Sequence, residues 1–224
     1  MDLRLRDELP ASFVSNLKAL EGFPISGEMK KRQVTVQMGD KPTEVLTTDE
    51  AYGRRYDRED GSEVVQFRRN GLTYSILKNY TSWDVLREAA RNAWQRFLAI
   101  SGPVNVSRLA LRYINAIDMP LGADFDEYLT AGPRIPKPLP PMVTGFIQRV
   151  FVPFDKDGAI AIITQTLETS TAGIIPAILD IEVFGECSLD GASAEVWSRL
   201  EKLRGIKNKV FFSSLTPKAL ELYK

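Results

Sequence analysis

The sequence predicts an α+β protein with two internally duplicated β-α-β(3–4)-α halves, which form a pseudo-twofold antiparallel sheet with helices on one face. Three observations predict this fold: glycine turns between short β-prone segments, a long amphipathic helix, and an element order that occurs twice. We expect one domain over residues 1–224, with pseudo-repeat halves of about 1–103 and 104–224. A chain of 224 residues can bury a substantial core.

The first half carries the clearest turn signals. Asp60-Gly61 and Asn70-Gly71 both suit two-residue type I′ turns, so strands near 52–59, 62–69 and 72–78 should form a meander. This pairing would set Arg58 opposite Glu63, Tyr56 opposite Val65 and Phe67 opposite Tyr74. Further strands are expected at 1–6 and 33–38.

Helical spacing of apolar residues predicts a long helix over 83–101, with Thr81 or Ser82 as its N-cap and Gly102-Pro103 at its end. Another helix is expected at about 10–21. In the second half we expect strands at 106–118, 143–154, 158–168 and 176–186, and helices at 124–131 and 191–204.

The duplication is predicted from matching residues as well as from element order. The segment 108–112 echoes 2–6, and Phe125, Leu129, Ala131 and Pro136 each lie 112 residues after Phe13, Leu17, Ala19 and Pro24. Pairing of strand 1–6 with strand 106–118 would join the halves and remove an exposed sheet edge.

Several stretches resemble an uncharacterised, sporadically distributed family of prokaryotic proteins with no assigned activity. The most specific is Leu111-Arg-Tyr-Ile-Asn115; the others are Asp60-Gly-Ser-Glu-Val-Val-Gln66, Tyr80-Thr-Ser-Trp83, Ile178-Leu-Asp-Ile-Glu-Val-Phe184 and Val210-Phe-Phe-Ser-Ser-Leu-Thr216. The resemblance implies a shared fold and transfers no catalytic residue. The chain departs from the family at its start, where the family is longer by most of a strand.

Alternation along the strands separates a face covered by helices from an open face. In the meander the covered face should carry the apolar residues Tyr56, Val65, Phe67, Tyr74 and Ile76. The open face should carry Arg55, Asp57, Val64, Gln66, Arg68, Thr73 and Ser75, which are mostly polar.

In the second half, alternation places Arg112, Asp180 and Glu182 on the open face. An arginine near two carboxylates is either a ligand-binding or acid/base group, or an ion-pair ladder of little energetic weight. Asn115 should lie on the apolar face near the end of its strand, where its amide needs partners and could hold the following loop.

Composition excludes several kinds of chemistry. With no histidine and one cysteine, Cys187, the chain lacks a Ser/His or Cys/His dyad, an imidazole-bound metal and an internal disulfide. We therefore predict no catalytic residue, metal or cofactor. The 29 basic and 29 acidic residues balance, which argues against nucleic-acid binding. The sequence shows neither a signal peptide nor an apolar run of membrane-spanning length, so we expect a cytoplasmic protein.

These observations favour a non-enzymatic binding or regulatory module that engages a protein partner or a small ligand through its open polar sheet face. The expected binding residues are Arg112, Asn115, Asp180, Glu182, Arg55 and Arg68. A homo-oligomer formed through the same face is a variant of this hypothesis. The alternatives are a hydrolase that uses carboxylates or a divalent metal at Asp180 and Glu182, and a nucleic-acid-binding protein.

Overall fold

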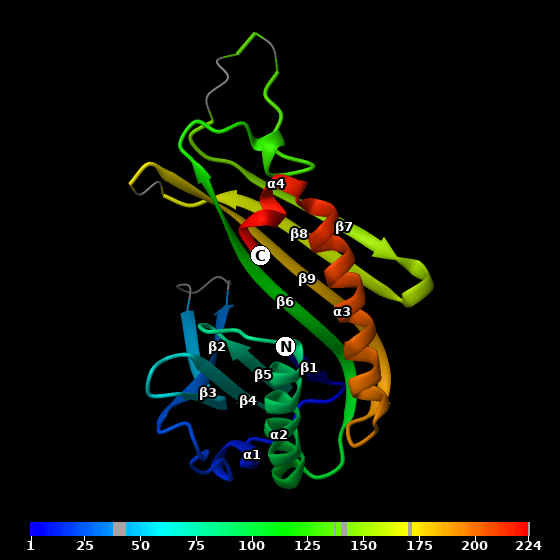
Figure 1. Cartoon of the computed structure of the whole chain (residues 1–224). Helices are drawn as coiled ribbons and strands as arrows, with labels where there is room; N and C mark the ends of the chain where they lie inside the picture. Colours follow the sequence, from blue (N-terminus) through cyan, green and yellow to red (C-terminus); the bar gives the residue numbers. More distant parts are fainter. Residues whose placement is uncertain (38–43, 137, 140–142, 170–171, 224) are drawn as a thin grey trace. The chain divides into compact units, whose positions relative to one another are not determined.

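The structure is a computed structural model that describes residues 1–37, 44–136, 138–139, 143–169 and 172–223. It has the expected α+β fold, with a large antiparallel sheet and few helices (Figure 1). The chain divides into two compact units. Unit 1 comprises Met1–Arg108 and Cys187–Val196, and unit 2 comprises Leu109–Glu186 and Trp197–Lys224. The single domain over 1–224 stays a prediction.

Unit 1 is built on an antiparallel meander. Its elements are β1 (Asp2–Leu5), α1 (Ser12–Ser15), β2 (Ile25–Gln37), β3 (Glu44–Asp57), β4 (Glu63–Arg68), β5 (Gly71–Ile76) and α2 (Trp83–Ser101). The strand order is β2-β3-β4-β5-β1, followed by the 105–108 end of β6 (Asn105–Pro120) and the 187–190 end of β9 (Ile174–Asp190). β1 thus lies beside β6, the neighbour that the sequence predicts.

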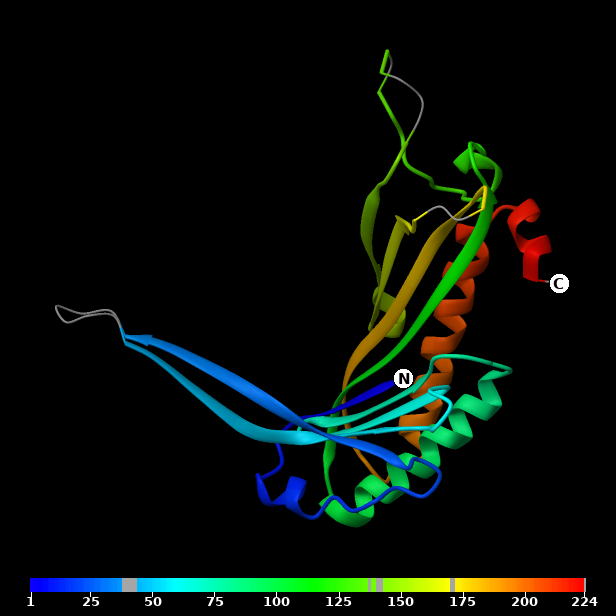
Figure 2. The ribbon, with the colours of Figure 1, turned by 90° about the vertical axis from the view of Figure 1, so that its left-hand side faces the viewer.

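The β2–β3 hairpin is much longer than the predicted strands 33–38 and 52–59. Its strands pair from Ile25 and Asp57 to Gln37 and Glu44, whereas β4 pairs with β3 only from Gly53 onward. Figure 2 shows the distal part of this hairpin extending away from the rest of the unit 1 strands as a two-stranded ribbon. Residue 38 of the predicted strand lies outside the described residues.

The two predicted turns have different outcomes. Tyr56 pairs with Val65, and the Arg58 amide donates to the Glu63 carbonyl at 3.0 Å, as the first turn predicts. The second register is wrong, because Phe67 pairs with Leu72 and not with Tyr74. Arg68 pairs with Gly71, so this glycine begins β5 instead of lying in the turn. The shift is two residues, which leaves every side chain on its predicted face.

The apolar face of unit 1 packs against helix α2. Tyr56, Val65, Phe67 and Tyr74 are buried there, and Ile76 is half-buried. The ring of Phe97 from α2 lies 5.6 Å from Phe67 and stacks on Trp94 at 5.0 Å. α2 spans the predicted 83–101, and its N-cap is Ser82, whose hydroxyl accepts the Val85 amide at 3.3 Å. Val64 departs from the prediction, because it is buried although it lies on the opposite face.

Unit 2 contains most of β6 and β9, together with the β-hairpin that lies between these two strands in the sequence. Its elements in chain order are β6, the 3-10 turn η1 (Phe125–Glu127), β7 (Ile147–Phe154), η2 (Asp155–Asp157), β8 (Ala159–Leu167), β9, α3 (Glu195–Ser214), α4 (Pro217–Leu220) and η3 (Glu221–Tyr223). The strand order is β6-β9-β8-β7. Helix α3 lies on the face that carries Tyr113, because the Lys207 ammonium sits 4.1 Å from the centre of that ring.

Helix ends are where local patterns were least informative. Of the predicted helix 10–21, only the single turn of α1 is helical. Phe13 in this turn and Leu17 and Leu20 after it are nevertheless buried, as their apolar character predicts. The helix predicted at 124–131 is only the 3-10 turn η1. The one predicted at 191–204 begins at Glu195 and continues to Ser214, because Gly205 lies in its interior without ending it. Within the described residues, no helix has both the length and the apolar character needed to cross a membrane.

Candidate functional site

The predicted Arg112–Asp180 pair forms on unit 2. Arg112 on β6 donates from Nε to Asp180 Oδ1 at 2.9 Å and from Nη2 to Oδ2 at 2.6 Å, which is a two-pronged contact with β9. The hydrogen bonding to Asp180 raises the pKa of Arg112. The Arg112 side chain is 58% exposed and the Asp180 side chain only 17%, so the arginine is the member of the pair that faces solvent.

Strand register defines what surrounds this pair. Residues directly opposite each other point to the same face of a sheet. One row runs from Asp180 to Thr164 and Arg149, and the next from Glu182 to Ile162 and Phe151. The charged groups therefore share a face with apolar side chains, and we call this surface the unit 2 open face.

Several apolar side chains of the unit 2 open face are exposed. Phe151 is 60% and Ile147 is 78% exposed, and both point to the same side of β7. Ile114, two residues after Arg112 on β6, is 62% exposed. Arg149 lies over the Phe151 ring at 5.3 Å. The predicted face is thus amphipathic instead of uniformly polar.

Asn115 lies on the covered face, as alternation predicts, and is half-buried. Its Nδ2 donates to the Leu179 carbonyl at 3.0 Å. The amide therefore ties β6 to β9, and not to the loop that follows β6. This bond gives Asn115 a structural role on the side of the sheet away from Arg112.

Arg55 and Arg68 both lie in unit 1, where each has its own carboxylate partner. Arg55 binds Asp57 on the same strand, with Nη2 at 2.6 Å from Oδ1, and about half of the arginine side chain is exposed. The hydrogen bonds from Arg55 lower the pKa of Asp57. Arg68 reaches across β5 to Asp2 on β1, at 2.5 Å between Nη2 and Oδ1.

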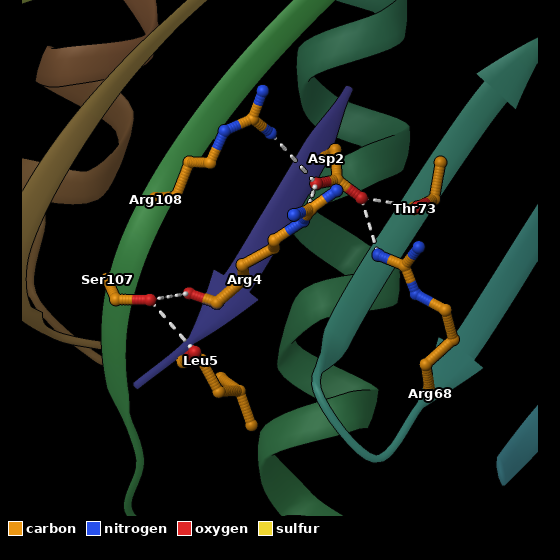
Figure 3. Close-up of polar contacts among 7 residues, drawn as sticks. All are labelled: Asp2, Arg4, Leu5, Arg68, Thr73, Ser107 and Arg108. Atoms are coloured by element: carbon orange, nitrogen blue, oxygen red, sulfur yellow. Dashed lines mark hydrogen bonds and ion pairs between the residues drawn. The ribbon is translucent and has the colours of Figure 1, made fainter. Parts of the chain in front are cut away.

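Asp2 is the centre of a larger polar group, which we call the Asp2 cluster and which Figure 3 shows. Its carboxylate contacts Arg68, the Thr73 hydroxyl at 2.6 Å, Arg4 at 3.3 Å and Arg108 at 3.5 Å. These side chains come from β1, β4, β5 and β6, four neighbouring strands of unit 1. The side chains of Asp2, Arg68 and Arg108 are each less than 20% exposed.

The charge state of Asp2 follows from its partners. Burial raises the pKa of Asp2, but the charge of Arg68 and the hydrogen bonds from Thr73 and Arg68 outweigh it, so the pKa lies below its ordinary value. Asp2 is therefore a carboxylate at neutral pH. The strand that carries it is held on both sides: Asp2 pairs with Thr73, and the Ser107 hydroxyl donates to the Leu5 carbonyl at 2.8 Å.

Sequence reasoning found part of this cluster. Alternation placed Arg68 and Thr73 on the open face, but it did not bring Asp2, Arg4 and Arg108 to them. A signal was present in Asp2-Leu-Arg-Leu-Arg6, where alternate positions are charged and the positions between them are apolar.

Across the described ranges, no three His, Cys, Asp or Glu side chains gather in a way that could hold a metal ion. Cys187 is half-buried, and its Sγ lies 3.5 Å from the Val106 carbonyl.

The chain matches no family model, and no curated protein or solved structure shows significant similarity to it. The resemblance to the uncharacterised prokaryotic family therefore stays a prediction from the sequence.

Proposed function

We propose that this chain is a binding or regulatory module that engages a protein partner through the unit 2 open face. The observation that carries this proposal is the combination of exposed Phe151, Ile147 and Ile114 with the Arg112–Asp180 pair on one surface. Exposed apolar groups beside fixed charges are typical of protein interfaces, because burial supplies affinity and the charges select the partner.

The hydrolase alternative has less support. Both oxygens of Asp180 already accept hydrogen bonds from Arg112. These contacts occupy both carboxylate oxygens, which leaves fewer of their acceptor positions open to a substrate or a metal ion. Nucleic-acid binding also has less support, because Arg112 and Arg55 are each paired with an aspartate.

The internal duplication belongs to the same proposal. Its support is topological: in unit 1 the first strand, β1, lies beside β5, and in unit 2 the first strand, β6, lies beside β9. In each unit a long helix follows that last strand of the meander. We propose that the two units are copies of one β-α-β(3–4)-α element. We also propose that the protein acts in the cytoplasm.

The test is affinity copurification from the source organism with Arg112→Glu and Phe151→Ser. The matched control is Arg32→Glu, because Arg32 also forms a two-pronged pair, with Asp49 at 2.8 and 3.1 Å, but in unit 1. We expect a partner that both unit 2 changes remove and the control retains. If the partner is a second copy, the two changes convert an oligomer into a monomer in size-exclusion chromatography. A set of copurifying proteins that is the same for all four proteins, with no change in oligomeric state, would refute the proposal.

A further inference from the structure

The geometry points to a second, separate site: the Asp2 cluster of unit 1 binds a phosphate-type oxyanion, with Arg68 and Arg4 as its principal ligands. This site lies in unit 1 and does not depend on the protein partner proposed for unit 2. Its ligand is either free phosphate or a phosphate monoester, since both present the same tetrahedral oxygens.

Arg68 supplies the first reason. Its side chain is only 15% exposed, and its Nη2 is engaged by Asp2. Its Nε is buried and has no hydrogen-bond partner within the part of the chain that the structure describes. A buried charged donor without an acceptor is costly, so this position favours an incoming oxygen atom.

Arg4 supplies the second reason. It meets the same carboxylate only through Nε, at 3.3 Å, and half of its side chain is exposed. One carboxylate therefore faces the guanidinium groups of both Arg4 and Arg68, and Arg108 contacts it as well. Guanidinium groups bind phosphate through paired N–H donors, and a dianion would balance the positive charge that one aspartate leaves.

Tyr52 on β3 is a neutral side chain in the electrostatic field of the Asp2 cluster. Burial raises the pKa of Tyr52, while the nearby charges of Arg68 and Arg4 lower it and those of Glu8 and Asp2 raise it. The phenol therefore lies within electrostatic range of the cluster and keeps its proton at neutral pH. A phenol that keeps its proton does not repel an approaching oxyanion.

Asp2 then has a defined role. It orients Arg4 and Arg68 in the absence of ligand, and its negative charge weakens the binding of an anion beside it. Removal of that charge should tighten phosphate binding, whereas removal of either arginine should weaken it. A cluster that serves only the fold predicts no such opposite signs.

The experiment is calorimetric titration of the full chain with inorganic phosphate at constant ionic strength. We expect Asp2→Asn to tighten binding roughly tenfold and Arg68→Gln to weaken it by at least about tenfold, the effect of one charge-assisted hydrogen bond. Arg32→Gln is the control, because its Asp49 pair is outside the cluster; it should bind like the wild type. Circular dichroism confirms that each variant is folded.

Arg4→Gln keeps the test decisive if Arg68→Gln does not fold. Because Arg4 is half-exposed, this substitution should weaken phosphate binding several-fold without unfolding unit 1. Phosphoserine and acetate distinguish the ligand source. Tighter binding of phosphoserine than of phosphate assigns the site to monoesters, and the reverse assigns it to free phosphate. The inference is overturned if neither the wild type nor Asp2→Asn binds phosphate, if Arg4→Gln binds as tightly as the wild type, or if acetate binds as tightly as phosphate.

Discussion

The substitution Gly71→Ala should disrupt the pairing of β1 with β5, because the added methyl group has no room between the two strands. The φ angle of Gly71 is +137°, a backbone conformation that residues with a side chain rarely adopt. A Cβ atom built there would lie 2.0 Å from the Leu3 carbonyl oxygen and 3.0 Å from the Arg4 Cα. Gly71 pairs directly with Arg4 in the β1–β5 register. The absence of a side chain therefore allows β1 to approach β5.

The magnitude of Gly71→Ala follows from these contacts. The backbone conformation alone costs about 1–3 kcal/mol for a residue with a side chain. The Leu3 carbonyl must also move by about 1 Å or more to reach an ordinary van der Waals distance, which breaks pairing next to the fully buried Leu3. We expect unfolding free energy to fall by about 3 kcal/mol or more, a large part of the stability of a typical domain.

Urea unfolding followed by tryptophan fluorescence measures this change, because Trp83 and Trp94 are buried in unit 1. The matched control is Gly27→Ala on β2, where an added Cβ meets nothing within 4 Å and no positive φ is required. The control should stay within about 0.5 kcal/mol of the wild type. If Gly71→Ala also stays within about 0.5 kcal/mol, the close packing of β1 on β5 is refuted.

Three further changes separate packing from charge. Phe97→Ala should cost about 3–5 kcal/mol in urea unfolding, because Phe97 is fully buried, whereas Phe212→Ala at a 59% exposed ring should cost little. Burial and Arg204 lower the pKa of Lys207 to about 8, below its unfolded value, so the unfolded chain binds more protons above pH 8. The unfolding free energy of the wild type relative to Lys207→Met should therefore rise between about pH 8 and the ordinary lysine pKa near 10.4. A difference between the two proteins that does not change with pH would contradict this. Arg55→Gln breaks an exposed pair and should shift unfolding by less than about 1 kcal/mol; a larger loss would show that the pair is not screened.

Alternation in the sequence was enough to assign faces, and turn chemistry was not enough to assign register. Asn70-Gly71 is a strong local turn signal, but the structure uses Gly71 for its contact with Leu3, far away in the chain. The face assignments survived because the register moved by an even number of residues. Tyr74 is thus buried as predicted although its cross-strand partner is Val65 instead of Phe67.

The candidate sites show the same division. Arg112 and Asp180 could be paired from sequence because each lies on a long, regularly alternating strand. The Asp2 cluster could not be assembled in this way, because it depends on β1 lying between β5 and β6 and on contacts between residues 66 and more positions apart. Local patterns fix the face of a side chain, whereas neighbours across strands are fixed by strand order.

The two charged groups should respond differently to the same kind of change, because they differ in exposure. Arg112 is 58% exposed, so solvent and salt screen its attraction to Asp180 and the pair adds little stability. Arg68 and Asp2 are both less than 20% exposed, and removal of one leaves the other poorly solvated. A charge change on unit 2 should therefore alter recognition while leaving the fold intact. The same change in the Asp2 cluster should alter both, so its ligand is best tested by variants that change anion affinity in opposite directions.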